Sequence, residues 1–173
     1  MPPAADIRRY IASDAPAVRA LFIAVNRAMA PEAMRAAFEA YFERSLREEI
    51  DRIEPYYAER QGSFWIAEDA GTLLGMFGLE RADPHSMELR RMYVAPAARR
   101  RGLARTMLVH AERVCAWSGC DRLILSTSEL QPAALQLYRT SGYVQVREDV
   151  AEAASNKTVG SGLRRFHFEK SLR

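Results

Sequence analysis

The chain has 173 residues, the length of one ordinary globular domain. Hydrophobic residues make up 49% of it and charged residues 27%, and the formal net charge of +3 is too slight for a protein that wraps nucleic acid. The longest apolar run, residues 20–25, is too short to span a bilayer, and residues 1–10 have no apolar core of signal-peptide length. We therefore expect a single domain over residues 1–173, located in the cytoplasm, with neither a membrane nor a nucleic acid as its partner.

The first third of the chain is expected to form one short strand and two helices. Residues 7–11 suit the strand, and a helix capped near Asp14 follows to about residue 30. A second helix is expected from Pro31 past residue 50, because apolar side chains recur every three or four residues from Met34 to Tyr57. Such a stripe is typical of a core or helix–helix seam, and a substrate-pocket wall is the alternative.

Three strands are expected next. Residues 64–68 and 72–80 form a hairpin around the turn at 69–71, and two glycines in its second strand, Gly75 and Gly78, indicate a bulge or close backbone packing. A loop at 81–86 then leads to a central strand over 88–94. Period-two alternation assigns its side chains to two faces: Glu88, Arg90, Met92 and Val94 on one, Leu89, Arg91 and Tyr93 on the other.

The stretch after the central strand has the parts of an anion site. Pro96 ends the strand, Gly102 permits a tight turn, and a helix begins at Leu103. The free N–H groups and dipole of that helix start favour a negative ligand. Four arginines add charge: Arg99, Arg100, Arg101 and Arg105. A diphosphate is the expected ligand, although a run of arginines is often only a solvated surface.

The remaining elements complete an α/β order. A strand over 122–126, a helix over 132–140 and a strand over 143–147 precede a long polar loop at 148–162, and residues 163–169 form the last strand. Cys115 and Cys120 are five apart on an expected helix, so they would point to different faces, and no second pair completes a metal site. We expect thiols that fill small interior spaces, and no bound metal.

The stretch over 88–105 resembles motif A of the GNAT superfamily of N-acetyltransferases. That family's pattern, Arg/Gln-x-x-Gly-x-Gly/Ala, is matched by Arg99, Gly102 and Ala104. The resemblance implies an α/β (α+β) fold: a mixed, mostly antiparallel twisted sheet of about seven strands, with helices on both faces.

A second match lies in the family order over residues 131–143. It resembles the family's Asn-x-x-Ala-x-x-Leu-Tyr-x-x-x-Gly-Phe segment through Ala134, Tyr138 and Gly142, while Gln131 stands where Asn is common. The resemblance implies an acetyl-CoA-dependent N-acyltransferase that moves an acetyl (acyl) group to a primary amine by direct attack. Its acceptor would be a small-molecule or peptide amine, and a homodimer is left open.

The resemblance also implies where the cosubstrate would bind. The pantetheine arm would pair with the central strand at Met92, Tyr93 and Val94, where that strand splays from the strand over 122–126. The pyrophosphate would lie on the turn and helix start: Arg99, Arg100, Arg101, Gly102, Leu103, Ala104 and Arg105. Gln131, Ala134 and Tyr138 would contribute from the second match.

Three residues are expected to act in catalysis. Tyr138 is the candidate general acid, since a phenol keeps its proton at neutral pH, and a bulge near Met92 would aim an N–H at the thioester carbonyl. Glu88 is the candidate base, directly or through water, and His85 is a less favoured one. A core role for Tyr138, and an ion pair of Glu88 with Arg90 or a neighbouring arginine, are the structural alternatives.

Two other functions remain open from the sequence. A CoA-binding sensor or interaction module would keep the fold without the chemistry. A nucleic-acid binder would use the arginine cluster, and it would bind with a steep salt dependence.

Overall fold

The computed structural model describes residues 5–173, which form one seven-stranded sheet in the order β1-β2-β3-β4-β5-β7-β6. Neighbouring strands are antiparallel except for β4 and β5. The strands are β1 (Asp6–Arg9), β2 (Ser63–Asp69), β3 (Thr72–Asp83), β4 (Ser86–Val94), β5 (Arg122–Ser128), β6 (Val144–Ala151) and β7 (Leu163–Ser171). The expected mostly antiparallel sheet is confirmed. Residues 1–4 of the stretch considered for a targeting signal lie outside the described residues.

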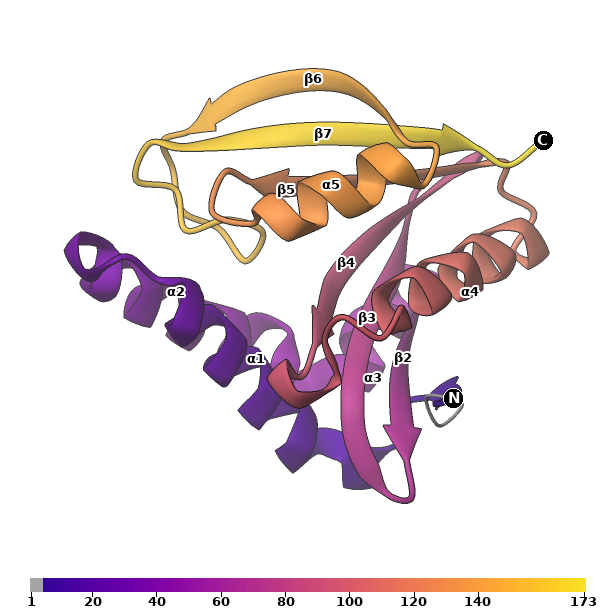
Figure 1. Ribbon diagram of the computed structural model, residues 1–173, viewed down its shortest axis with the longest axis horizontal. Helices are drawn as coiled ribbons and strands as arrows, with labels where there is room; N and C mark the ends of the chain where they lie inside the picture. Colours follow the sequence, from indigo (N-terminus) through magenta and orange to yellow (C-terminus); the bar gives the residue numbers. More distant parts are fainter. Residues whose placement is uncertain (1–4) are drawn as a thin grey trace.

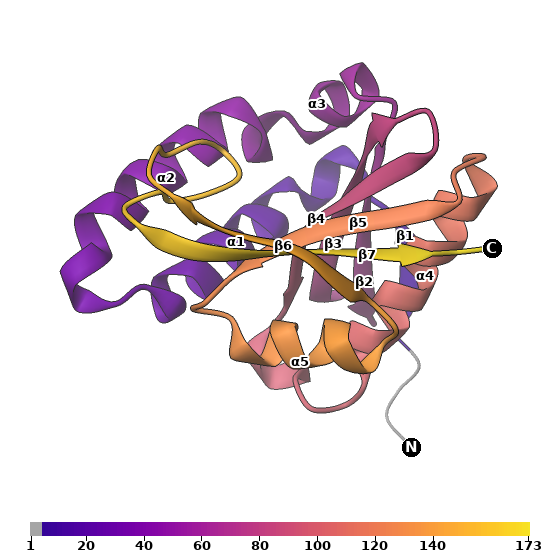
Figure 2. The ribbon, with the colours of Figure 1, turned by 90° about the horizontal axis from the view of Figure 1, so that it is seen from above.

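Helices cover both faces of the sheet, as expected (Figures 1 and 2). One face carries α1 (Ala15–Met29), α2 (Arg35–Glu48) and α3 (Ile53–Glu59), and the other carries α4 (Leu103–Trp117) and α5 (Pro132–Thr140). Four single 3-10 turns complete the elements: η1 (Ala12–Asp14), η2 (Glu32–Met34), η3 (Ile50–Arg52) and η4 (Pro96–Ala98).

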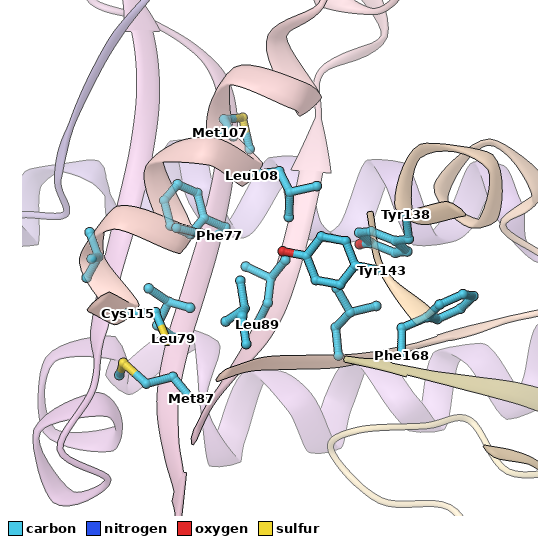
Figure 3. Close-up of a cluster of buried hydrophobic side chains, with 14 of the residues drawn as sticks. Phe77, Leu79, Met87, Leu89, Met107, Leu108, Cys115, Tyr138, Tyr143 and Phe168 are labelled. Atoms are coloured by element: carbon cyan, nitrogen blue, oxygen red, sulfur yellow. The ribbon is translucent and has the colours of Figure 1, made fainter. Parts of the chain in front are cut away.

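Each face of the sheet has its own apolar core. Between the sheet and α4 and α5, Phe77, Met107 and Phe168 are buried together (Figure 3). Between the sheet and α1 to α3, Phe22 and Tyr57 belong to a second buried cluster. Burying one such side chain stabilises the fold by roughly 1.5–3 kcal/mol, so both layers hold the sheet in place.

The single helix expected from Pro31 to Tyr57 is wrong, because the chain divides at Glu49. That residue leaves the helical region, with φ −138° and ψ −61°, and α2 ends before it. The Glu49 carboxylate lies in the interior, where arginines of β4 bind it. Apolar spacing continues across the break, so periodicity did not reveal it.

Two boundaries also differ from expectation. The predicted loop at 81–86 is a tight turn, because β3 extends to Asp83 and the Asp83 carboxylate accepts a hydrogen bond from the His85 backbone N–H at 2.7 Å. The predicted loop at 148–162 is shorter, because β6 continues to Ala151.

The prediction that both cysteines lie on one helix is wrong. The helix α4 ends at Trp117, and the Cys120 N–H donates to the Cys115 carbonyl at 3.2 Å. Both thiols are free and buried. Within residues 5–173, no group of three or more His, Cys, Asp or Glu side chains is placed to hold a metal ion, and none of the helices combines the length and apolar character needed to cross a membrane.

The parallel pairing of β4 with β5 is short. It runs only from Ser86 opposite Arg122 to Glu88 opposite Ile124. Beyond that point the two strands diverge toward their carboxyl ends (Figure 1). The expected splay is therefore present, and it opens the centre of the sheet.

Candidate active site

A cavity lies where β4 and β5 diverge. It has a volume of about 100 Å³ and is open to solvent on one side. Its walls come from β4, from the end of β5, from α1, α2 and α5, from the segment between β6 and β7, and from the start of β7. Five predicted site residues line it together: Glu88, Met92, Tyr93, Gln131 and Tyr138.

The central strand carries the expected bulge. Arg90 pairs with Gly78 and Tyr93 pairs with Met76, so β4 uses one residue more than β3 between these pairs. Arg91 has a positive φ of 54°, which is uncommon for a non-glycine residue. The extra residue interrupts the ladder next to Met92, which is where the resemblance placed a free N–H.

The bulge overturns the predicted faces of the strand. Met92 and Val94 pack with Leu89 against the core beneath α4 and α5. Glu88 lies on the opposite face, where it contacts Lys157, and it therefore does not share a face with Met92 and Val94 as predicted. One inserted residue reverses the alternation of every side chain beyond it.

A buried ionic network supports the bulge. Glu49 has no exposed side-chain surface, and its carboxylate accepts hydrogen bonds from Arg91 at 2.6 Å and Arg90 at 3.1 Å. The Tyr57 hydroxyl donates to the same carboxylate at 2.6 Å. Burial alone would raise the pKa of Glu49, but the two guanidinium groups hold it below its ordinary value.

Lys157 links two further carboxylates at the cavity. Its ammonium donates to Glu80 at 2.9 Å and to Glu88 at 2.8 Å. Burial alone would lower the pKa of Lys157, yet the Glu88 and Glu80 carboxylates hold it above its ordinary value. The candidate base is thus ion-paired, but with a lysine rather than with Arg90 or a neighbouring arginine.

Tyr138 is both a core residue and a cavity residue. Its side chain is only 6% exposed, and its ring packs edge-on to Tyr143 at 5.8 Å and against Phe168 at 5.9 Å (Figure 3). Burial raises the pKa of the Tyr138 phenol above its ordinary value. The hydroxyl therefore carries its proton throughout the neutral range.

The predicted anion turn has the conformation that such a site needs. Gly102 adopts φ +78° immediately before α4, and a Cβ placed there would meet nothing within 4 Å. Arg100 also has a positive φ, 61°. The exposed residues of this turn are Arg99, Arg100, Arg101, Gly102 and Arg105. Leu103 is buried and Ala104 half-buried, so only their main-chain N–H groups could serve a ligand.

Other predicted residues have structural partners. The Arg99 side chain donates to the Val94 carbonyl at 3.3 Å, and Arg105 donates to the Thr140 hydroxyl at 3.2 Å. The Gln131 side-chain oxygen accepts from the Thr127 hydroxyl at 2.7 Å. Ala134 packs against the core beneath α5.

Several cavity residues were not anticipated. Arg90, Arg91, Lys157 and Arg165 all line the cavity, and Glu49 lies behind it. One signal was available: two consecutive arginines in a central strand require buried carboxylates, and Glu49 falls on the apolar stripe of the second helical segment, four residues before Ile53.

Comparison with known proteins gives consistent matches. A sequence model described as the acetyltransferase (GNAT) family matches residues 28–143. N-acetyltransferase family 8 member 3 of Rattus norvegicus is 33% identical over 98 residues, covering 54% of this chain and 43% of the relative. N-acetylaspartate synthetase of Danio rerio is 29% identical over 116 residues, covering 66% of this chain and 41% of the relative. The chain thus spans less than half the length of these two relatives.

A solved structure shares the fold over nearly the whole chain. A putative acetyltransferase from Salmonella typhimurium, solved with its cofactor acetyl-CoA, superposes with a TM-score of 0.70 at 16% identity, covering 98% of this chain and 94% of that one.

Proposed function

Because the chain belongs to the acetyltransferase (GNAT) family, we propose that it transfers an acetyl group from acetyl-CoA to a primary amine by direct attack. One observation carries the proposal: the bulge of β4, Tyr138 and Glu88 all meet at the cavity where β4 and β5 separate. A small amine or the amino group of a peptide is the proposed acceptor.

The turn before α4 fits the diphosphate of the cosubstrate. Open space at Gly102 lets an anion approach the main chain, and the exposed Arg100 and Arg101 add positive charge. The edge of β4 from Met92 to Val94 that faces away from β3, where β5 no longer pairs with it, would hold the pantetheine arm. Acetyl-CoA supplies the activated thioester, and the protein supplies position and proton transfer.

The proposed reaction balances with three groups of this chain. The amine nitrogen bonds to the acetyl carbon and the carbon–sulfur bond breaks. The Met92 N–H stabilises negative charge on the carbonyl oxygen, and the departing sulfur receives the Tyr138 proton. Glu88 takes the proton of the amine, directly or through water, in exchange for part of its contact with Lys157. Loss of that proton from Glu88 to solvent and uptake of one by the Tyr138 phenolate restore both groups for the next turnover.

Replacing Tyr138 with phenylalanine tests the proposal. We expect turnover to fall about 10²- to 10⁴-fold, because a positioned acid is lost, with little change in the Kd for CoA. Steady-state kinetics over an amine panel, followed by free thiol, measures the first quantity, and calorimetry measures the second.

Tyr143→Phe is the matched control. Tyr143 is buried in the same aromatic cluster, but its hydroxyl donates to Glu112 at 3.0 Å. We expect a modest loss of stability and unchanged turnover. Equal turnover for Tyr138→Phe and the wild type would remove Tyr138 from the acid role. If the protein binds CoA but releases no free thiol from acetyl-CoA with any amine, it is a CoA-binding module. If it binds nucleic acid with a steep salt dependence and does not bind CoA, it is a nucleic-acid binder.

A further inference from the structure

Three of the four cationic side chains that line the cavity are neutralised by carboxylates of this chain. Arg90 pairs with Glu49 and Glu80, and Arg91 pairs with Glu49. Lys157 pairs with Glu80 and Glu88. Carboxylates of this chain therefore already compensate the positive charge of these three groups, so they attract a ligand anion only weakly.

Arg165 is the fourth cation, and its situation differs. Its guanidinium donates to the Ser126 hydroxyl at 2.7 Å, and no carboxylate of residues 5–173 forms an ion pair with it. Asp149, its cross-strand neighbour, instead pairs with His167 at 3.1 Å and Arg147 at 3.4 Å. Ser126 thus holds the guanidinium at the cavity without a salt bridge, and the charges of Asp149 and Glu88 act on it only from beyond ion-pair distance.

The partly buried surroundings of Arg165 destabilise its charged guanidinium. Burial lowers the pKa of the guanidinium below its ordinary value, although an arginine remains charged at neutral pH. A partly desolvated cation that has no salt bridge gains most from an anion that enters the same space. The planar guanidinium matches a carboxylate through two parallel hydrogen bonds.

We propose that Arg165 binds a carboxylate of the acceptor, so that the acceptor is an amine that also carries a carboxylate, such as a free amino acid. This inference rests on the proposed acetyl transfer and names its substrate class. Glu88 and Arg165 line the same cavity, so the acceptor's amino group can face the base while its carboxylate meets the guanidinium.

The anion at Arg165 is distinct from the phosphates of the cosubstrate. The arginines of the turn, residues 99–105, are absent from the described residues that line the cavity, whereas α1 and α2 contribute Asn26, Phe38 and Tyr41. Arg165 therefore belongs to the side of the cavity that the α1 and α2 helices close, and the phosphate-binding turn precedes α4 on the other face.

Matched acceptors test the proposal on the full chain. L-phenylalanine and L-leucine would each be compared with the amino acid amide and with the amine that lacks the carboxyl group. For the wild type we expect kcat/KM to be about 10²-fold higher for the free amino acids. Arg165→Met should lower kcat/KM for the amino acids by about the same factor, mainly through KM, and leave the neutral amines unchanged.

Two further variants separate recognition from folding. Arg165→Lys keeps the charge but loses the two-point geometry, so it should retain part of the preference. Arg164→Met is the matched control, since the neighbouring Arg164 is exposed and pairs with Glu148 at 2.8 Å. It should keep the wild-type preference in full.

The outcomes distinguish this inference from the proposed function. Acetylation of neutral amines as fast as amino acids, with no effect of Arg165→Met, overturns the carboxylate site and keeps the acetyltransferase. If no amine is acetylated, the proposed acetyl transfer is wrong. Thermal denaturation then tests by itself whether Arg165 binds a carboxylate. Amino acids that raise the Tm of the wild type but not of Arg165→Met support it, and equal shifts overturn it.

Discussion

At position 49, one carboxylate without exposed surface forms ion pairs with two adjacent arginines of the central strand. Removing one member of such a group leaves a buried charge unpaired, which costs far more than breaking a surface ion pair. Glu49 therefore holds together the break after α2, the bulge of β4 and the adjacent cavity wall.

Acid should release this carboxylate. The pKa of Glu49 is held below the ordinary value of about 4.3, so its contribution is complete above about pH 5 and is lost as the pH falls through the folded-state pKa. We expect Glu49→Gln to lower the free energy of unfolding at pH 7 by about 3–5 kcal/mol, and to flatten its decline between about pH 5 and pH 3. Urea denaturation at a series of pH values measures both effects.

The adjacent Glu48 gives a control of the same chemistry. It is exposed, and its ion pair with Arg44 is long, at 3.9 Å. Glu48→Gln should change the free energy of unfolding by less than about 1 kcal/mol and keep the pH dependence. A similar loss in both variants would contradict the role given to Glu49.

Among the elements, those with strong periodic patterns were predictable. The hairpin at 64–80, the helix beginning at Leu103 and the helix after Gln131 were all anticipated, since each has a clear pattern and a defined start. The break at Glu49 was not, because it depends on arginines about 40 residues away in the sequence. Ion pairs between residues far apart in the sequence do not change the local spacing of apolar residues.

The faces of β4 were predicted wrongly for a related reason. Alternation with period two is valid only while each residue has one partner, and the bulge between Arg90 and Tyr93 adds one residue. The resemblance to a known motif predicts the bulge, and the bulge places Met92 and Val94 on the face opposite to the one that simple alternation predicts. For this reason Glu88 was predicted to share a face with Met92 and Val94, which it does not.

Gly78 of β3 lies directly against the Tyr57 side chain of α3. A Cβ at this position would overlap the hydroxyl and ring of Tyr57, which is buried and bound to Glu49. We expect Gly78→Ala to lower the free energy of unfolding by about 1–3 kcal/mol, because the ring has no free space to enter. Chemical denaturation measures the loss.

Gly75→Ala on the same strand is the comparison. There a Cβ would lie 2.7 Å from the Met107 sulfur, the middle of a flexible side chain, and 3.1 Å from the Tyr93 carbonyl. Its cost should be smaller than that of Gly78→Ala. The reverse order would refute the close packing of Tyr57 as the reason for glycine at position 78.

At the scale of the whole molecule, the segment over 152–162 joins the two halves of the sheet. It connects β6 to β7, yet its contacts are with the other half: Arg44 of α2 donates to the Ala154 carbonyl at 2.6 Å, and Lys157 reaches β3 and β4. Val159 is buried in the core beneath α1 to α3. The segment therefore closes one side of the cavity.

Replacing Lys157 with methionine should loosen this closure. The Lys157 side chain is 43% exposed, so each of its ion pairs is partly screened. We expect amide hydrogen exchange over 152–162 to rise roughly 5- to 30-fold, equivalent to about 1–2 kcal/mol, while the central strands stay protected.

The other lysine provides the control. Lys170 of β7 pairs with Glu112 of α4 at 2.9 Å, away from this segment. Lys170→Met should leave exchange over 152–162 unchanged. Equal exchange in the wild type and Lys157→Met would show that Arg44, Asn156 and Val159 hold the segment without the lysine.

The candidate site was predictable in its outline and not in its charge balance. Motif spacing brought Glu88, Met92, Gln131 and Tyr138 to one place, and all four line the cavity. Lys157 and Arg165 arrive from a polar loop and a C-terminal strand that match no short pattern. Their positions follow from the folding of β6 and β7 onto β5, which sequence spacing does not describe.

We expect the short pairing of β4 with β5 to affect the stability of the protein in a cell as well. Beyond Glu88 and Ile124 each strand presents unpaired main chain, as the rim of a sheet does, although both lie in its middle. The extended pantetheine arm that we propose for that gap would pair with these strands and shield their exposed edges from other chains. Scarcity of CoA would then lower the standing amount of the protein through aggregation and proteolysis, in addition to slowing its chemistry.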